Sequence, residues 1–107
     1  MNLDSVKKLM YEQDFKEAEK LLQKGLKIEK NKFMIFYFLG LVYFELRVLD
    51  KSIKFFKKSL KLRPDNISTY LKLASLYQTM GDTEKSKNNF LTESKFIMFI
   101  KTLYSYY

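Results

Sequence analysis

The chain has 107 residues, which is enough for one hydrophobic core but not for separate cofactor and substrate lobes. It contains no His and no Cys, which excludes imidazole and thiolate metal sites, thiol nucleophiles and disulfides. The formal net charge is +8, so an anionic partner has to be considered. Three Gly and one Pro are too few turn signals for a β-sandwich or barrel, and long helices are therefore expected.

Apolar side chains recur at spacings of three and four along most of the chain, which predicts amphipathic helices. We expect helices over residues 3–12, 15–29, 33–46, 49–62, 67–80 and from 83 to 96 or beyond. The stops and N-caps between them are expected at Asn31, at Pro64-Asp65-Asn66 and at Gly81-Asp82. Six helices of this length predict three antiparallel hairpins.

Small side chains stand where two helices of a hairpin are expected to meet. Gly40, Ser52 and Ser59 interrupt runs of bulky residues and allow two helix axes to approach closely. Each hairpin is apolar on two sides and cannot bury both sides alone. Neighbouring hairpins are therefore expected to stack.

The chain repeats itself at an offset of 34 residues, which is the period of a helical repeat array. Phe36, Leu39, Gly40 and Tyr43 are followed in register by Tyr70, Leu73, Ala74 and Tyr77. The motif Phe36-x2-Leu39-Gly40-x2-Tyr43, continued by Ser52-x3-Phe56-x2-Ser59-x4-Pro64, resembles the tetratricopeptide repeat. The third copy matches less well, and the first retains only its second half.

The resemblance implies an all-α, right-handed α-solenoid of about six helices in a single domain. Its three repeats are expected at about residues 1–32, 33–66 and 67–100, with an apolar C-terminal extension over 97–107. Members of the family generally bind other proteins in a concave groove lined by the first helix of every repeat. The resemblance therefore implies a non-enzymatic interaction module, an adaptor or a co-chaperone-like scaffold, that binds a partner helix or peptide.

The expected groove is apolar in its centre and polar at its two ends. The predicted partner-binding residues are Met34, Tyr37, Phe38, Leu41 and Phe44, together with Lys7, Leu71, Lys72 and Gln78. Two interpretations of the apolar centre stay open. Either the chain's own tail or Leu3 and Met10 cover it, or it is an open pocket for a partner segment, as contiguous apolar patches often are.

Some members of the family hold a C-terminal carboxylate with a clamp of Lys, Asn and Arg side chains. At the corresponding positions this chain has Leu3, Lys7, Phe38, Ser68 and Lys72. Only two of these are cations, so the chaperone-tail ligand of those relatives is not predicted. Lys7 and Lys72 are expected to attract an acidic flank of a partner.

A basic segment without an acid runs from Lys51 to Arg63. We interpret it chiefly as a solvated helix face, with nucleic acid or an anionic membrane as the alternatives. Only two of the twenty cations are Arg, the residue that makes bidentate contacts to phosphate and guanine, which disfavours nucleic acid.

The end of the chain departs from the polar capping helix that usually closes such an array. Its apolar side chains include Phe96, Ile97, Phe99, Ile100, Leu103 and Tyr104. The tail either folds back onto the array, docks with a second copy, or belongs to a shortened version of a longer repeat protein. We favour self-association into a homodimer, in which case removing residues 97–107 should give a monomer.

Catalysis and cofactor binding are not expected. Asp14, Asp50 and Asp82 stand at turns where helix capping explains them, and no Gly-rich phosphate loop or metal-ligand cluster occurs. Charged residues near the N-terminus argue against a cleaved leader. The longest uncharged stretch covers residues 33–44, which is too short for a bilayer span, so a cytoplasmic location is expected.

Overall fold

The computed structural model describes residues 2–80, and this part of the chain is all-helical, without strands. The five helices are α1 (Leu3–Tyr11), α2 (Phe15–Ile28), α3 (Phe33–Glu45), α4 (Leu49–Leu62) and α5 (Ile67–Thr79). Every one of them begins and ends within one residue of its predicted bounds. The sixth predicted helix, from residue 83, lies outside the described residues.

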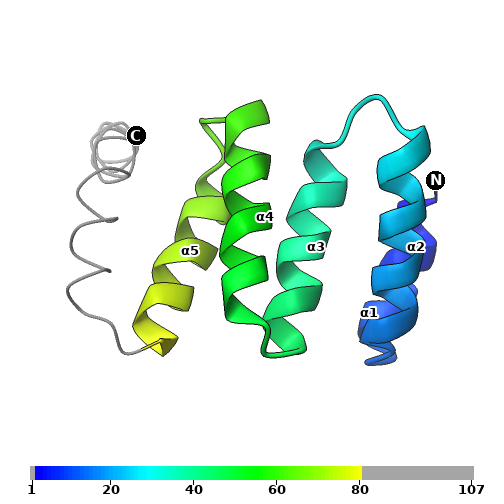
Figure 1. The fold of residues 1–107 in the computed structure, drawn as a ribbon, viewed down its shortest axis with the longest axis horizontal. Helices are drawn as coiled ribbons and strands as arrows, with labels where there is room; N and C mark the ends of the chain where they lie inside the picture. Colours follow the sequence, from blue (N-terminus) through cyan, green and yellow to red (C-terminus); the bar gives the residue numbers. More distant parts are fainter. Residues whose placement is uncertain (1, 81–107) are drawn as a thin grey trace, which may run out of the picture.

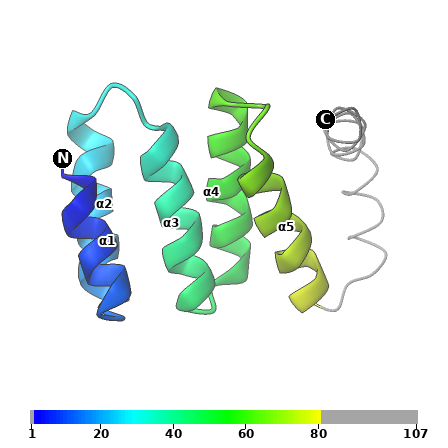
Figure 2. The same ribbon diagram turned by 180° about the vertical axis from the view of Figure 1, so that it is seen from behind.

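The helices run antiparallel in chain order and form two layers (Figure 1). Helices α2 and α4 face the viewer in Figure 1, and α1, α3 and α5 face the viewer in the reverse view of Figure 2. This arrangement confirms the predicted all-α fold of stacked helical hairpins. None of the helices within residues 2–80 is both long and apolar enough to cross a membrane.

At two of the predicted positions an asparagine side chain binds the start of a helix: Asn66 is the N-cap of α5, and Asn31 lies one residue before the N-cap of α3. The Asn66 side-chain oxygen accepts hydrogen bonds from the Thr69 backbone N–H at 3.0 Å and from the Thr69 hydroxyl at 2.8 Å. The Asn31 side-chain oxygen accepts from the Phe33 backbone N–H at 3.3 Å. The expectation for Asp14 is wrong, because its side chain makes no capping hydrogen bond to α2. Its backbone (φ −89°, ψ 68°) lies outside the extended conformation that is usual at an N-cap.

Small residues bring α3 and α4 into close contact, as predicted. A Cβ atom added to Gly40 would lie 2.6 Å from the Cδ1 atom of Phe56, inside van der Waals contact. The buried Ser52 hydroxyl donates to the Gly40 carbonyl oxygen at 2.6 Å, and the Ser59 hydroxyl donates to the Phe33 carbonyl oxygen at 3.3 Å. The hydroxyls therefore join the two helices and leave no buried polar atom of their own unpaired.

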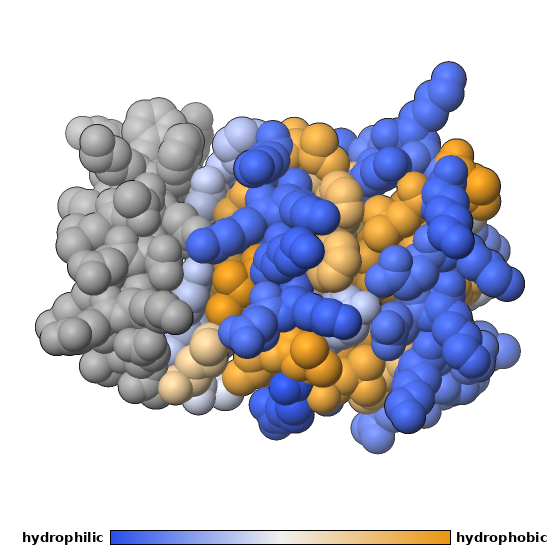
Figure 3. Space-filling model, viewed as in Figure 1, coloured by the Kyte–Doolittle hydropathy of each residue, from blue (hydrophilic) through white to orange (hydrophobic). Residues whose placement is uncertain are grey.

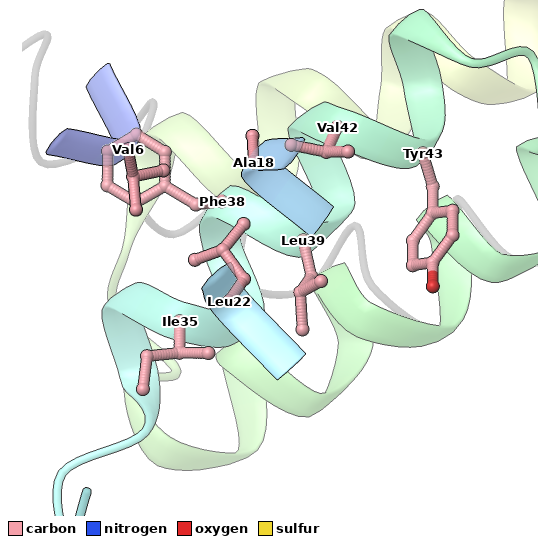
Figure 4. Close-up of a cluster of buried hydrophobic side chains, with 8 residues drawn as sticks. All are labelled: Val6, Ala18, Leu22, Ile35, Phe38, Leu39, Val42 and Tyr43. Atoms are coloured by element: carbon pink, nitrogen blue, oxygen red, sulfur yellow. The ribbon is translucent and has the colours of Figure 1, made fainter. Parts of the chain in front are cut away.

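The core consists of two apolar clusters, and α3 takes part in both. The first cluster comprises Val6, Ala18, Leu22, Ile35, Phe38, Leu39, Val42 and Tyr43 (Figure 4). The second comprises Phe56, Leu60, Tyr70, Leu73, Leu76 and Tyr77. Leu41 packs against both clusters. The position of α3 between two cores explains why this helix is apolar on all sides.

Candidate functional site

The predicted groove residues all lie on α1, α3 and α5, the layer that faces the viewer in Figure 2. We call this face the α1/α3/α5 surface. Its centre is α3, and its two sides are α1 and α5. The structure brings the predicted residues to one layer, but it buries them to very different degrees.

Phe38 belongs to the core more than to the surface. Its side chain is 7% exposed and lies beside Val6 in the first cluster (Figure 4). Leu3 and Met10 of α1 pack against the same cluster. These contacts agree with the interpretation in which Leu3 and Met10 cover part of the apolar centre.

Tyr37, Leu41 and Phe44 are half-buried and form the floor of the α1/α3/α5 surface. The Tyr37 ring packs edge-on against Phe38, with 5.9 Å between ring centroids, and against Phe56, with 5.8 Å. Burial among these rings raises the pKa of the Tyr37 hydroxyl above its ordinary value. The Arg47 guanidinium lies 5.5 Å from the Phe44 ring centroid. The floor is thus apolar, packed against neighbouring rings and only partly buried.

The α5 side of this surface carries an exposed leucine between polar residues. Leu71 is 62% exposed, and it lies 34 residues after Tyr37, at the same position of the next repeat. Lys72 and Gln78 are exposed on the same helix, and Lys7 is exposed on α1. The surface therefore has an apolar floor with a cation on each side.

Met34 lies at one end of this surface. It is half-buried and borders a hollow of about 150 Å³ that Leu3, Glu29, Asn31 and Ile35 also line. Pockets that bury a drug-sized ligand usually measure about 300 to 1,000 Å³. This hollow is therefore too small to bury a drug-sized ligand.

Residues 2–80 contain no group of His, Cys, Asp and Glu side chains that could hold a metal ion. The predicted self-association residues Phe96, Ile97, Phe99, Ile100, Leu103 and Tyr104 lie outside the described residues. The same is true of the tail that would cover the groove in one of the two interpretations. Both expectations stay predictions.

The sequence interpretation missed a set of aromatic contacts made by the cations of α4. Lys58 lies over the rings of Phe36 and Phe55, and Lys51 lies over the ring of Tyr43. The available signal was the spacing of Phe36 and Tyr43, seven residues apart on one helix face. Which lysines meet them depends on how α4 packs on α3, and the sequence pattern does not show that packing.

Comparison with known proteins identifies the repeat. The tetratricopeptide repeat family matches the chain twice, over residues 35–66 and over residues 55–88. Superkiller complex protein 3 of Homo sapiens is 33% identical over 76 residues, covering 71% of this chain and 5% of the relative.

Two further relatives carry the repeat in their names. The tetratricopeptide repeat protein 37 of Xenopus laevis is 30% identical over 71 residues, covering 66% of this chain and 4% of its own. The TPR repeat-containing protein MJ0941 of Methanocaldococcus jannaschii is 36% identical over 58 residues, covering 54% of this chain and 17% of its own. The chain thus spans only a small part of the length of these relatives.

Proposed function

Because the chain belongs to the tetratricopeptide repeat family, whose domains generally mediate protein–protein interaction, we propose that the α1/α3/α5 surface binds a segment of another protein. The family generally serves as non-enzymatic scaffolding, and the proposed role is that of an adaptor. The main support for the proposal is the exposure of Leu71 on α5, at the position of the repeat that Tyr37 occupies on α3.

The partly exposed side chains of the proposed site determine the kind of partner that can bind. Tyr37 and Leu41 are held in place by the two core clusters beneath them, so a partner does not have to order them on binding. Full burial of a leucine side chain is worth about 1.5 to 3 kcal/mol, and Leu71 has most of that still to gain. A helix or extended segment with apolar side chains fits this surface.

Two cations define the rim of the proposed site. Lys7 and Lys72 are exposed on α1 and α5, on either side of α3. Contacts with exposed charges of this kind contribute about 1 kcal/mol or less each. We therefore expect them to favour partners with an acidic flank, while the apolar contacts supply most of the affinity.

Leu71→Ser tests the proposal, with Leu62→Ser as the matched control. Leu62 is also an exposed leucine, with 52% of its surface accessible, but it lies at the end of α4, outside the α1/α3/α5 surface. Peptides selected from a displayed random library on the wild-type protein should bind Leu71→Ser about ten times more weakly, since one apolar contact is lost. Binding to Leu62→Ser should be unchanged, as measured by titration calorimetry.

Circular dichroism should show that both variants keep the wild-type helix content, because both side chains are exposed. The proposal is contradicted if the library yields no binding peptide. It is equally contradicted if Leu71→Ser and Leu62→Ser weaken binding to the same extent.

A further inference from the structure

The α2/α4 face carries an aromatic strip that the proposed function does not use. Tyr43 lies between the two helices: its hydroxyl donates to the Glu19 carboxylate of α2 at 3.0 Å, and its ring stacks on Phe55 of α4 with 5.5 Å between centroids. Phe55 in turn stacks on Phe36 at 6.0 Å. Phe36 and Phe55 are only half-buried. Figure 3 shows hydrophobic side chains gathered between the hydrophilic side chains of α2 and α4.

Two lysines of α4 place their ammonium groups over the rings of this strip. The Lys58 ammonium lies 5.6 Å from the Phe36 ring centroid and 5.4 Å from that of Phe55. The Lys51 ammonium lies 5.3 Å from the Tyr43 ring centroid. Aromatic rings attract a cation through their faces, so these contacts fix the two charges beside the apolar strip without neutralising them.

The rest of α4 repeats the same charge at helical spacing. Lys51, Lys54, Lys58 and Lys61 are exposed and follow one another at spacings of three, four and three residues, which places them along one face of the helix. This row is about 15 Å long at the rise of an α-helix. These four lysines form no ion pair with a carboxylate of residues 2–80.

Two acids of α2 already have partners within the described part of the chain. Glu17 of α2 pairs with Lys20 at 3.4 Å, and Glu19 accepts the hydrogen bond of the Tyr43 hydroxyl. Between residues 49 and 63 the chain has six cations and one acid, Asp50. The α2/α4 face is therefore a row of positive charge beside a half-buried aromatic strip.

From this geometry we infer that the α2/α4 face docks an acidic amphipathic segment of a partner protein. Its carboxylates pair with the lysine row, and its aliphatic side chains cover Phe36 and Phe55. Nucleic acid fits less well, because the ring faces on which bases would stack are occupied by neighbouring rings and by Lys58. This surface lies on the opposite layer from the α1/α3/α5 surface, and the inference does not rest on the proposed function.

The probe is a synthetic helical peptide with Glu at spacings of three, four and three and Leu between them. Its control is the same peptide with Gln at every Glu position. The protein variants are Lys54→Glu/Lys61→Glu, which leaves the two ring-bound lysines in place, and Lys8→Glu/Lys30→Glu. The second pair changes the net charge equally, but Lys8 and Lys30 are exposed on α1 and between α2 and α3, outside the residues of both proposed sites.

Fluorescence anisotropy at low salt should show that the Glu peptide binds the wild type and the Gln peptide does not. Lys54→Glu/Lys61→Glu should weaken binding at least about tenfold, and Lys8→Glu/Lys30→Glu at most about twofold, because attraction between exposed charges is local. Circular dichroism checks that both variants fold.

Three results would overturn the inference. The first is that the Glu peptide fails to bind, and the second is an equal loss in both double variants. The third is that single-stranded RNA of matched charge, or vesicles with anionic lipid, bind the wild type more tightly than the Glu peptide and lose binding in Lys54→Glu/Lys61→Glu. None of these results affects the test of Leu71.

Discussion

At the scale of single residues, Gly40 sets how closely α3 and α4 pack. The Phe56 ring occupies the space that a side chain at position 40 would need, and Phe56 is itself buried and unable to move away. Ser52 reinforces the contact by its hydrogen bond to the Gly40 carbonyl oxygen. The closest point of the central hairpin is therefore an interlocking of one glycine and one aromatic ring.

Gly40→Ala should lower the free energy of unfolding by about 1 to 3 kcal/mol, the usual cost of overpacking a core. This loss outweighs the gain of about 1 kcal/mol that Ala brings over Gly in a helix. Urea denaturation measures it. In a Phe56→Leu background the cost of Gly40→Ala should be smaller, because the smaller side chain leaves room. Equal costs in the two backgrounds would contradict the interlocking.

Tyr43 of α3 links the pH dependence of stability to its own contact with α2. Burial is the largest influence and raises the pKa of its hydroxyl above 10.0; the hydrogen bond with Gln23 lowers this pKa, and the hydrogen bond and charge of the Glu19 carboxylate raise it. A pKa that is higher in the folded state means that the stabilisation is complete below pH 10 and is lost as the pH rises above it.

The midpoint temperature of thermal unfolding should therefore fall more steeply above pH 10 for the wild type than for Tyr43→Phe, which has no hydroxyl to ionise at this position. Tyr11→Phe serves as the control for removing a tyrosine hydroxyl, since Tyr11 is 90% exposed. Parallel curves for the wild type and Tyr43→Phe would contradict the assignment of alkaline sensitivity to Tyr43.

At the scale of helices, the start of α5 depends on one side chain. Asn66 accepts two hydrogen bonds from Thr69, whose side chain is buried. Asn66→Ala should lower the free energy of unfolding by about 1 kcal/mol, the usual value of an N-cap. Asp65→Ala, one residue earlier on an exposed turn, should change it little. Chemical denaturation of the two variants compares them, and equal losses would contradict the cap.

The bounds of the helices could be predicted because the 34-residue period and the turn residues agree. The backbone conformation of the turns could not be predicted in the same way. Gln13 and Arg47, 34 residues apart, both have positive φ, at 61° and 63°. The chain has Gly81 at the next equivalent position, where a left-handed conformation costs least, but Gln and Arg do not signal it. The position within the 34-residue repeat therefore predicts the positive φ better than the residue type does.

The exposure of residues on α3 was the least predictable feature of the helices. Every side of this helix is apolar, so periodicity does not separate core positions from surface positions. Phe38 and Tyr37 are neighbours in the sequence, but Phe38 packs with Val6 while Tyr37 stays half-buried. The difference comes from where α1 lies, and short-range patterns do not specify that position.

At the scale of the molecule, the two layers present surfaces of opposite character. The α1/α3/α5 surface has an apolar floor with few charges, and the α2/α4 face has a row of lysines beside an aromatic strip. The stacking of hairpins separates the first helix of each repeat from the second. The two proposals therefore assign two interaction surfaces to one short chain, for segments of different chemistry.

Backbone amide chemical shifts show whether the α1/α3/α5 surface binds a polypeptide segment. The isotope-labelled protein is titrated with a library-selected peptide, and the shifts are followed. We expect the largest shifts on α3 and α5, around Tyr37, Leu41 and Leu71. Shifts confined to α2 and α4, or shifts that persist unchanged in Leu71→Ser, would contradict it.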